Sequence, residues 1–190
     1  MAIQSRMPPL SDAAMSDAQR AAAAELIAGP RKGVKGPFIP LLRSPDLMAR
    51  LQKVGEYLRF GSTLPPRLSE FATLLVSRAW SQQFEWATHV PLALKAGTSQ
   101  STLDDLAVGR RPREMSDEEF IVYDFTAELS SNRGVCDATY AGAVERFGEQ
   151  GVVDLVALLG YFTLISMELN VSQTPAEENQ AVPPLVRLPV

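Results

Sequence analysis

The chain has 190 residues, of which 46% are hydrophobic and 21% charged, a composition typical of a folded globular protein and not of a disordered one. Its net charge of −4 is mild, and the scattered lysines and arginines form no basic stripe interleaved with aromatic residues, which argues against nucleic acid as a partner. The single cysteine, Cys136, excludes an intrachain disulfide, a Cys-x-x-Cys redox pair and a cysteine-rich zinc site.

The N-terminal segment lacks the basic start and continuous apolar core of a signal peptide, and no stretch reaches the roughly 20 apolar residues of a membrane-spanning helix. We therefore expect a cytoplasmic protein with no membrane partner. Helical periodicity dominates and alternating β-branched runs are nearly missing, so the sequence predicts an all-α fold of about seven or eight helices. The predicted helices span residues 17–28, 45–60, 66–80, 82–95, 101–108, 117–129, 137–148 and 149–170.

Serine, proline and glycine mark the ends of these helices. Ser16 is a predicted N-cap, Ser44 caps a helix with Pro45 in its first turn, and Ser116-x-x-Glu119 is a capping box. In the last helix, Gly160 would allow another backbone to approach closely.

Two segments outside the predicted helices are also informative. Residues 29–43, GPRKGVKGPFIPLLR, form a long Pro/Gly-rich connection that is too apolar to lie in water, and such loops are often functional. The last twenty residues contain four prolines and are expected to form an extended arm. The predicted organisation is an N-terminal helical extension at 1–35, a helical domain at 36–170 and a C-terminal arm at 171–190.

The polar chemistry of the chain is concentrated in residues 68–97. His89, the only histidine, lies four residues after Glu85 and seven after Gln82, which places all three on one face of a helix. Glu70 lies in the preceding helix within an otherwise apolar run. Such groups cost free energy among apolar neighbours unless they are paired or used, so this segment is the candidate site, with Trp86 and Trp80 as possible walls.

Each residue also has a structural interpretation. His89 could be a core histidine held by a hydrogen bond, Glu85 one half of a surface ion pair, and Glu70 a clamp between helices. Gln82 would bind rather than react. One imidazole cannot supply the three or four ligands of a zinc site, so no metal is expected.

The segment LPPRLSEFATLLVSRAWSQQFEWATHVPLALKAG, followed by VYDFTAEL and FGEQGVVDLVALLGYFTLI, resembles the carboxymuconolactone decarboxylase family, which includes the alkylhydroperoxidase D-like proteins. The resemblance extends from about Gly36 to Asn170. It implies a domain of helical hairpins that assembles into trimers or hexamers.

The peroxidase branch of that family carries a glutamate, a Cys-x-x-Cys pair and a histidine, and these positions fall at Glu70, Gln82, Glu85 and His89. Glutamine and glutamate cannot replace the attacking and resolving thiols of a dithiol peroxidase, so that mechanism is excluded even if a family-level peroxidase label applies. What remains resembles the cysteine-free decarboxylase branch, in which a small lactone acid loses carbon dioxide without metal or organic cofactor.

We therefore predict a cofactor-independent decarboxylase-like enzyme for a small carboxylated lactone or enolisable ring. His89 would protonate the carbanion or dienolate, with Glu70 and Glu85 completing the polar centre. Arg43 is the candidate cation for the substrate carboxylate if its loop folds over the pocket, with Arg78 as the second choice; the alternative for each is a solvated surface arginine. Isomerisation or hydrolysis in the same pocket is the alternative reaction.

A non-enzymatic alternative is an oligomeric binding protein. In that case the three residues of the polar centre would bond to each other with no open pocket beside them. Residues 149–170 are apolar nearly all round, which predicts a homo-oligomer, from dimer to hexamer.

Overall fold

Helix-capping residues set the boundaries of the helices in the computed structural model, which describes residues 4–176 and 182–186. Within those residues the chain forms helices and no strand, so the predicted all-α class is confirmed. The elements are η1 (Asp12–Ala14), α1 (Asp17–Ala28), α2 (Phe38–Leu41), α3 (Pro45–Phe60), α4 (Pro66–Ala79), α5 (Gln83–Ala96), α6 (Gln100–Ala107), α7 (Asp117–Asn132) and α8 (Asp137–Ser172).

The predicted caps hold in two of three cases. Ser16 caps α1, and Ser116 forms its capping box with Glu119 at the start of α7. Ser44 makes no capping hydrogen bond, so the start of α3 rests on Pro45, whose fixed φ suits the first turn. The long connection contains a short helix, α2, that the sequence did not predict.

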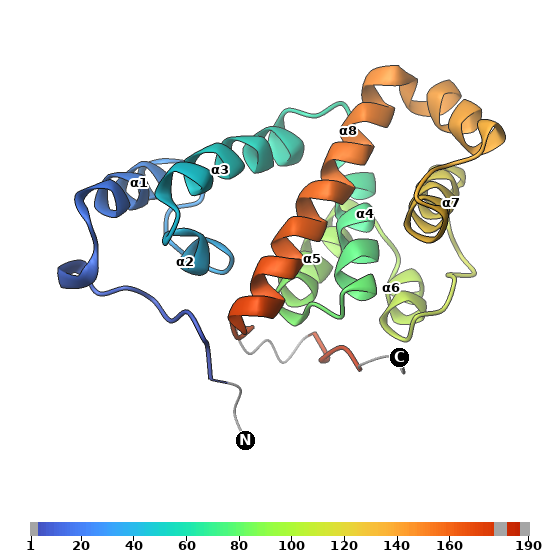
Figure 1. The fold of residues 1–190 in the computed structure, drawn as a ribbon. Coiled ribbons are helices and arrows are strands. Elements are labelled where there is room, and N and C mark those ends of the chain that lie inside the picture. Colours follow the sequence, from blue (N-terminus) through green and yellow to red (C-terminus); the bar gives the residue numbers. More distant parts are fainter. Residues whose placement is uncertain (1–3, 177–181, 187–190) are drawn as a thin grey trace.

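The helix α8 is divided by Gly148, which adopts a left-handed φ of 69° where the sequence predicted the boundary between two helices. Figure 1 shows the chain turning there. The segment before Gly148 packs near α7, and the longer segment after it crosses the molecule.

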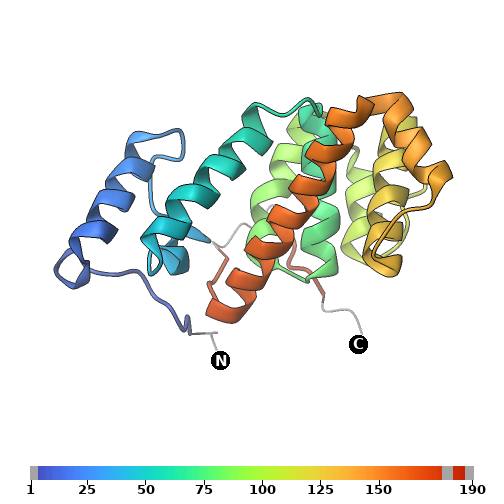
Figure 2. The ribbon, with the colours of Figure 1, turned by 45° about the horizontal axis from the view of Figure 1, so that its top comes forward.

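The core is built around α4, which contacts α5, α7 and α8. Its residues Leu68, Phe71 and Leu74 are fully buried. The helices α1 to α3 lie on one side of this centre and α6 and α7 on the other, with α8 across them (Figures 1 and 2). Because α3 contacts α8, the N-terminal helices form part of the same packed structure.

One face of α8 is buried and the opposite one is exposed. By length and hydropathy alone α8 could cross a membrane, but more than half of its most apolar window is buried inside the fold, as expected of a core helix. Its exposed face carries large apolar side chains, namely Val153, Val156, Leu164, Met167 and Val171. Gly160 lies on this exposed side, and a Cβ atom added to it would meet no atom of the described chain within 4 Å, so the predicted close approach is wrong for contacts within one chain.

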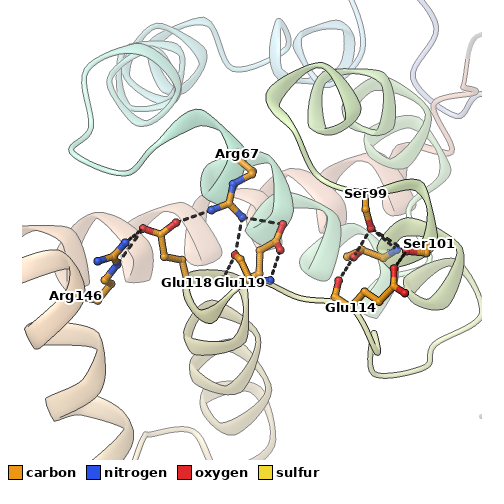
Figure 3. A network of polar contacts seen from close by, with 9 residues as sticks. Arg67, Ser99, Ser101, Glu114, Glu118, Glu119 and Arg146 are labelled. Atoms are coloured by element: carbon orange, nitrogen blue, oxygen red, sulfur yellow. Dashed lines mark hydrogen bonds and ion pairs between the residues drawn. The ribbon is translucent and has the colours of Figure 1, made fainter.

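An ion-pair network ties α4 to α7 and α8 (Figure 3). Arg67 contacts Glu118 at 2.5 Å and Glu119 at 3.0 Å, and Arg146 pairs with the other oxygen of Glu118. Beside it, Ser101 donates a hydrogen bond to Glu114, which fixes α6 to the turn before α7. These contacts are structural, since none of these residues lines the cavity described next.

Candidate functional site

A cavity of about 660 Å³ opens between the N-terminal helices and the core. Its wall is formed by residues of the connection after α1, by the end of α3, by one face of α5 and by α8. The connection predicted to be functional therefore covers the cavity, and its own residues Arg31 and Phe38 line it. Residues on both sides of the predicted domain boundary between residues 35 and 36 contribute to this wall. The boundary itself stays a prediction.

The start of α5 sets which of its residues face the cavity. Gln82 has an extended backbone, and its side-chain oxygen accepts a hydrogen bond from the amide of Phe84 at 2.6 Å, so it is the N-cap of α5. From that start, Glu85 and His89 lie one turn apart and both reach the cavity wall.

The turn between α4 and α5 brings Glu70 opposite His89. Ser81 takes a left-handed φ of 47° there, which reverses the chain into an antiparallel helix pair. Glu70 lies 11 residues before Ser81 and His89 lies 8 residues after it, and the antiparallel packing of the two helices brings their side chains together. The oxygen Oε2 of Glu70 is 2.5 Å from Nδ1 of His89.

Both ring nitrogens of His89 face a carboxylate. Nε2 lies 3.3 Å from Oε2 of Glu85, a longer contact than the one between Nδ1 and Glu70. The imidazole is buried and packs edge-to-face on Phe162, with 5.1 Å between ring centroids. The structure therefore brings the three residues of the predicted polar centre together, with Glu85 and His89 on the cavity wall and Glu70 behind them.

The two carboxylates determine the charge of His89. Burial by itself lowers the pKa of the imidazole, but the interactions with Glu70 and Glu85 outweigh it and raise the pKa from 6.5 to about 9. At neutral pH this raised pKa favours the imidazolium form of His89, held between the two carboxylates. The non-enzymatic alternative predicted that these residues bond to each other without an open pocket; they do bond, but a cavity lies beside them.

Among the described residues, the cavity wall does not include the predicted binding residues Gln82, Trp86 and Trp80. The amide of Gln82 donates to Asn170 at 3.0 Å in addition to capping α5. Trp86 is buried in the core, and Trp80 ends α4 with its carbonyl accepting from Asn170. Their roles in the structure are packing and helix capping.

The two predicted cations also lie elsewhere. Arg43 donates to the carbonyls of Ile39 at 3.0 Å and Pro8 at 2.7 Å, outside the cavity wall. Arg78 donates to the carbonyl of Ala107 at 3.0 Å and to that of Val186, in the described part of the C-terminal arm. Backbone carbonyls therefore accept hydrogen bonds from both guanidinium groups, although Nε of Arg78 has no acceptor among the described residues.

Sequence reasoning missed Arg31, Arg59 and Tyr161, all of which line the cavity. Arg31 belongs to the connection that the sequence marked as functional, which is the one signal that pointed to it. Arg59 and Tyr161 lie in ordinary helical patterns with no distinguishing feature. Within the described part of the chain, no three His, Cys, Asp or Glu side chains are grouped so as to hold a metal ion.

Comparisons with known proteins agree with this arrangement. Residues 45–120, which contain Glu70, Glu85 and His89, match the model of the carboxymuconolactone decarboxylase family. The fold is similar to a crystal structure described as the alkylhydroperoxidase AhpD core of an uncharacterized peroxidase-related protein from Ralstonia eutropha JMP134, with a TM-score of 0.75, 19% identity, and coverage of 92% of this chain and 93% of that one. The curated proteins give no match. The family match over residues 45–120 and the helical fold shared with the AhpD-like structure both support the resemblance predicted from the sequence.

Proposed function

We propose that the protein is a cofactor-independent enzyme of the decarboxylase type that acts on a small carboxylated lactone or enolisable ring. The observation that supports this function is the buried His89, held by two carboxylates on the wall of a cavity of about 660 Å³. That volume suits a small organic molecule. The raised pKa of His89 supplies a proton donor at neutral pH.

In the proposed reaction the carbon–carbon bond to the leaving carboxylate breaks, and its electron pair stays on the ring as an enolate or dienolate. His89 then transfers its Nε2 proton to the carbanionic carbon and becomes neutral. A proton from solvent restores the imidazolium, so each turnover consumes one proton and releases carbon dioxide. Glu70, at Nδ1, holds the ring so that Nε2 is the atom that reacts.

Glu85 supports one second candidate reaction. Its carboxylate lies beside His89 on the same wall, so it could remove a proton from a substrate carbon while His89 returns one elsewhere. That pair of steps is an isomerisation. A dithiol peroxidase mechanism is not proposed, because Gln82 and Glu85 occupy the cysteine positions and the exposed Cys136 does not line the cavity.

The test is turnover of muconolactone-type acids, followed by mass spectrometry of the product. We expect loss of carbon dioxide with the wild-type protein and at least about a hundredfold lower rate with His89→Ala, since a general acid contributes about that much or more. Glu70→Ala should also lower the rate. Cys136→Ser is the matched control and should leave the rate unchanged. Unchanged turnover in both His89→Ala and Glu70→Ala would refute the proposal, and a product of unchanged mass would assign the isomerase reaction.

A further inference from the structure

The side chains that line the cavity beside His89 carry a net positive charge, whereas the net charge of the whole chain is negative. Arg31, Lys35 and Arg59 line it, against the single carboxylate of Glu85. The positive charge of His89 is balanced by the carboxylate of Glu70 behind it, which leaves three cations against one carboxylate, while the protein carries a net charge of −4. An excess of cations in a hollow of an acidic protein indicates an anionic ligand.

One buried nitrogen of each arginine lacks a hydrogen-bond acceptor among the described residues. Nη2 of Arg31 and Nε of Arg59 are buried and have no hydrogen-bond acceptor. Buried donors are almost always paired, and an unpaired donor of a charged group carries a desolvation cost. Arg43, by contrast, has two carbonyl partners. A ligand with carboxylate oxygens would satisfy Arg31 and Arg59.

Aromatic contacts hold both guanidinium groups in place. Arg31 lies over the ring of Phe38 at 4.5 Å, and Arg59 lies over the ring of Phe60 at 5.2 Å. A guanidinium stacked on a ring keeps its edge, where the N–H groups are, free for an acceptor. The arginines are therefore oriented before any ligand arrives.

A glycine in α3 makes room for this arrangement. A Cβ atom at Gly55 would lie 2.3 Å from the hydroxyl of Tyr161 and 2.9 Å from Nη2 of Arg31. These two donors thus converge over the glycine, next to the cavity. Burial raises the pKa of Tyr161, so its hydroxyl keeps its proton and can donate.

We propose that Arg31 and Arg59, assisted by Tyr161, form an anion-binding site that holds a carboxylate of a small organic ligand in this cavity. The inference rests on the proposed function only in placing the reacting carbon near His89. Ion pairing stabilises a carboxylate against loss of carbon dioxide, so the group bound here is an anchor that the reaction leaves in place. A guanidinium pair with a fixed orientation suits the planar carboxylate.

The test uses benzoate as the probe, with benzamide as its neutral counterpart, in isothermal titration calorimetry on the full chain. Benzoate should bind, and benzamide should bind at least about tenfold more weakly. Arg31→Met and Arg59→Met should each weaken benzoate binding by about tenfold or more, while retaining the wild-type circular dichroism spectrum. Arg43→Met is the matched control, since that arginine comes from the same connection but lies outside the cavity wall, and it should bind as the wild type does.

Equal binding of benzoate and benzamide, or unchanged benzoate binding in both arginine variants, would overturn the proposal. Stronger competition by inorganic phosphate than by acetate would assign the site to phosphorylated ligands and also overturn it. Should the two methionine variants misfold, Arg31→Lys and Arg59→Lys replace them, with weaker binding expected because lysine cannot form the two-pronged contact. The binding assay needs no turnover, so the anion site and the proposed reaction can fail separately.

Discussion

Raising the pH through 9 is expected to deprotonate His89 and to remove the stability that its imidazolium contributes. The pKa is about 9 in the folded protein, against 6.5 for an ordinary histidine. Between these values the folded state binds one proton more than the unfolded state, so stability falls as the pH rises. Each pH unit corresponds to about 1.4 kcal/mol, which gives about 3 kcal/mol over the whole window. The contribution is complete below the unfolded pKa and lost as the pH passes the folded one.

The single histidine makes the measurement direct. In protein without a polyhistidine tag, the single histidine gives one Cε1–H signal in a proton–carbon NMR spectrum, and the titration midpoint of that signal is the pKa of His89. Urea unfolding at about pH 6 and about pH 10 gives the change in free energy of unfolding. In Glu70→Gln we expect the midpoint to fall by about one unit or more and the pH dependence to shrink, since one of the two acids is gone.

Glu145→Gln is the control, because it removes an exposed carboxylate that is not part of the site. Its titration midpoint should equal that of the wild type. A wild-type midpoint at or below the ordinary histidine value would refute the reasoning, and so would a midpoint that is the same with and without Glu70. Either result would mean that the two carboxylates do not hold the proton on His89.

Three further expectations can be checked independently. First, if His89 acts as the proton donor, kcat/KM should decline above about pH 9, where the imidazolium of the free enzyme loses its proton, and a rate that is flat to higher pH contradicts this role. Second, Gly55→Ala should lower the melting temperature and weaken benzoate binding, because the added methyl group meets Tyr161 and Arg31. Gly142→Ala, whose added Cβ meets no atom of the described residues within 4 Å, should instead stabilise the helix by up to about 1 kcal/mol; a Gly55→Ala variant as stable as the wild type would contradict the prediction. Third, we propose that the exposed apolar face of α8 mediates self-association, so Val156→Glu and Met167→Glu should lower the mass measured by light scattering, a prediction that a monomeric wild type would contradict.

Much of the fold follows from local signals in the sequence. Helix ends depend on neighbouring residues, so Ser16, Ser116 and Gly148 could be interpreted without knowledge of the tertiary structure. The relation between Glu85 and His89 is also local, since one helical turn separates them. Glu70 is singled out by its position in an otherwise apolar run and by the family resemblance, and the packing of α4 on α5 is the physical reason that it meets His89.

The cationic wall could not be predicted in the same way. Arg31 and Arg43 belong to one connection, and which of them faces the cavity depends on the path of a loop that has no periodicity. That path includes Gly36, whose left-handed backbone lies against the ring of Phe84 with no space for a side chain. The surroundings of Gly55 and Gly160 could not be predicted either, because the tertiary packing alone decides which glycine lies against another side chain.

The residues around the cavity come from inside and from outside the stretch that matches the family model. Glu70, Glu85 and His89 all lie inside residues 45–120, whereas Arg31 precedes that stretch and Tyr161 follows it. The proposed proton donor and two of the three proposed anion-binding residues thus lie in different stretches of the chain. Relatives could inherit the donor intact and still diverge in what they accept, through changes in flanking segments that leave the central helices untouched.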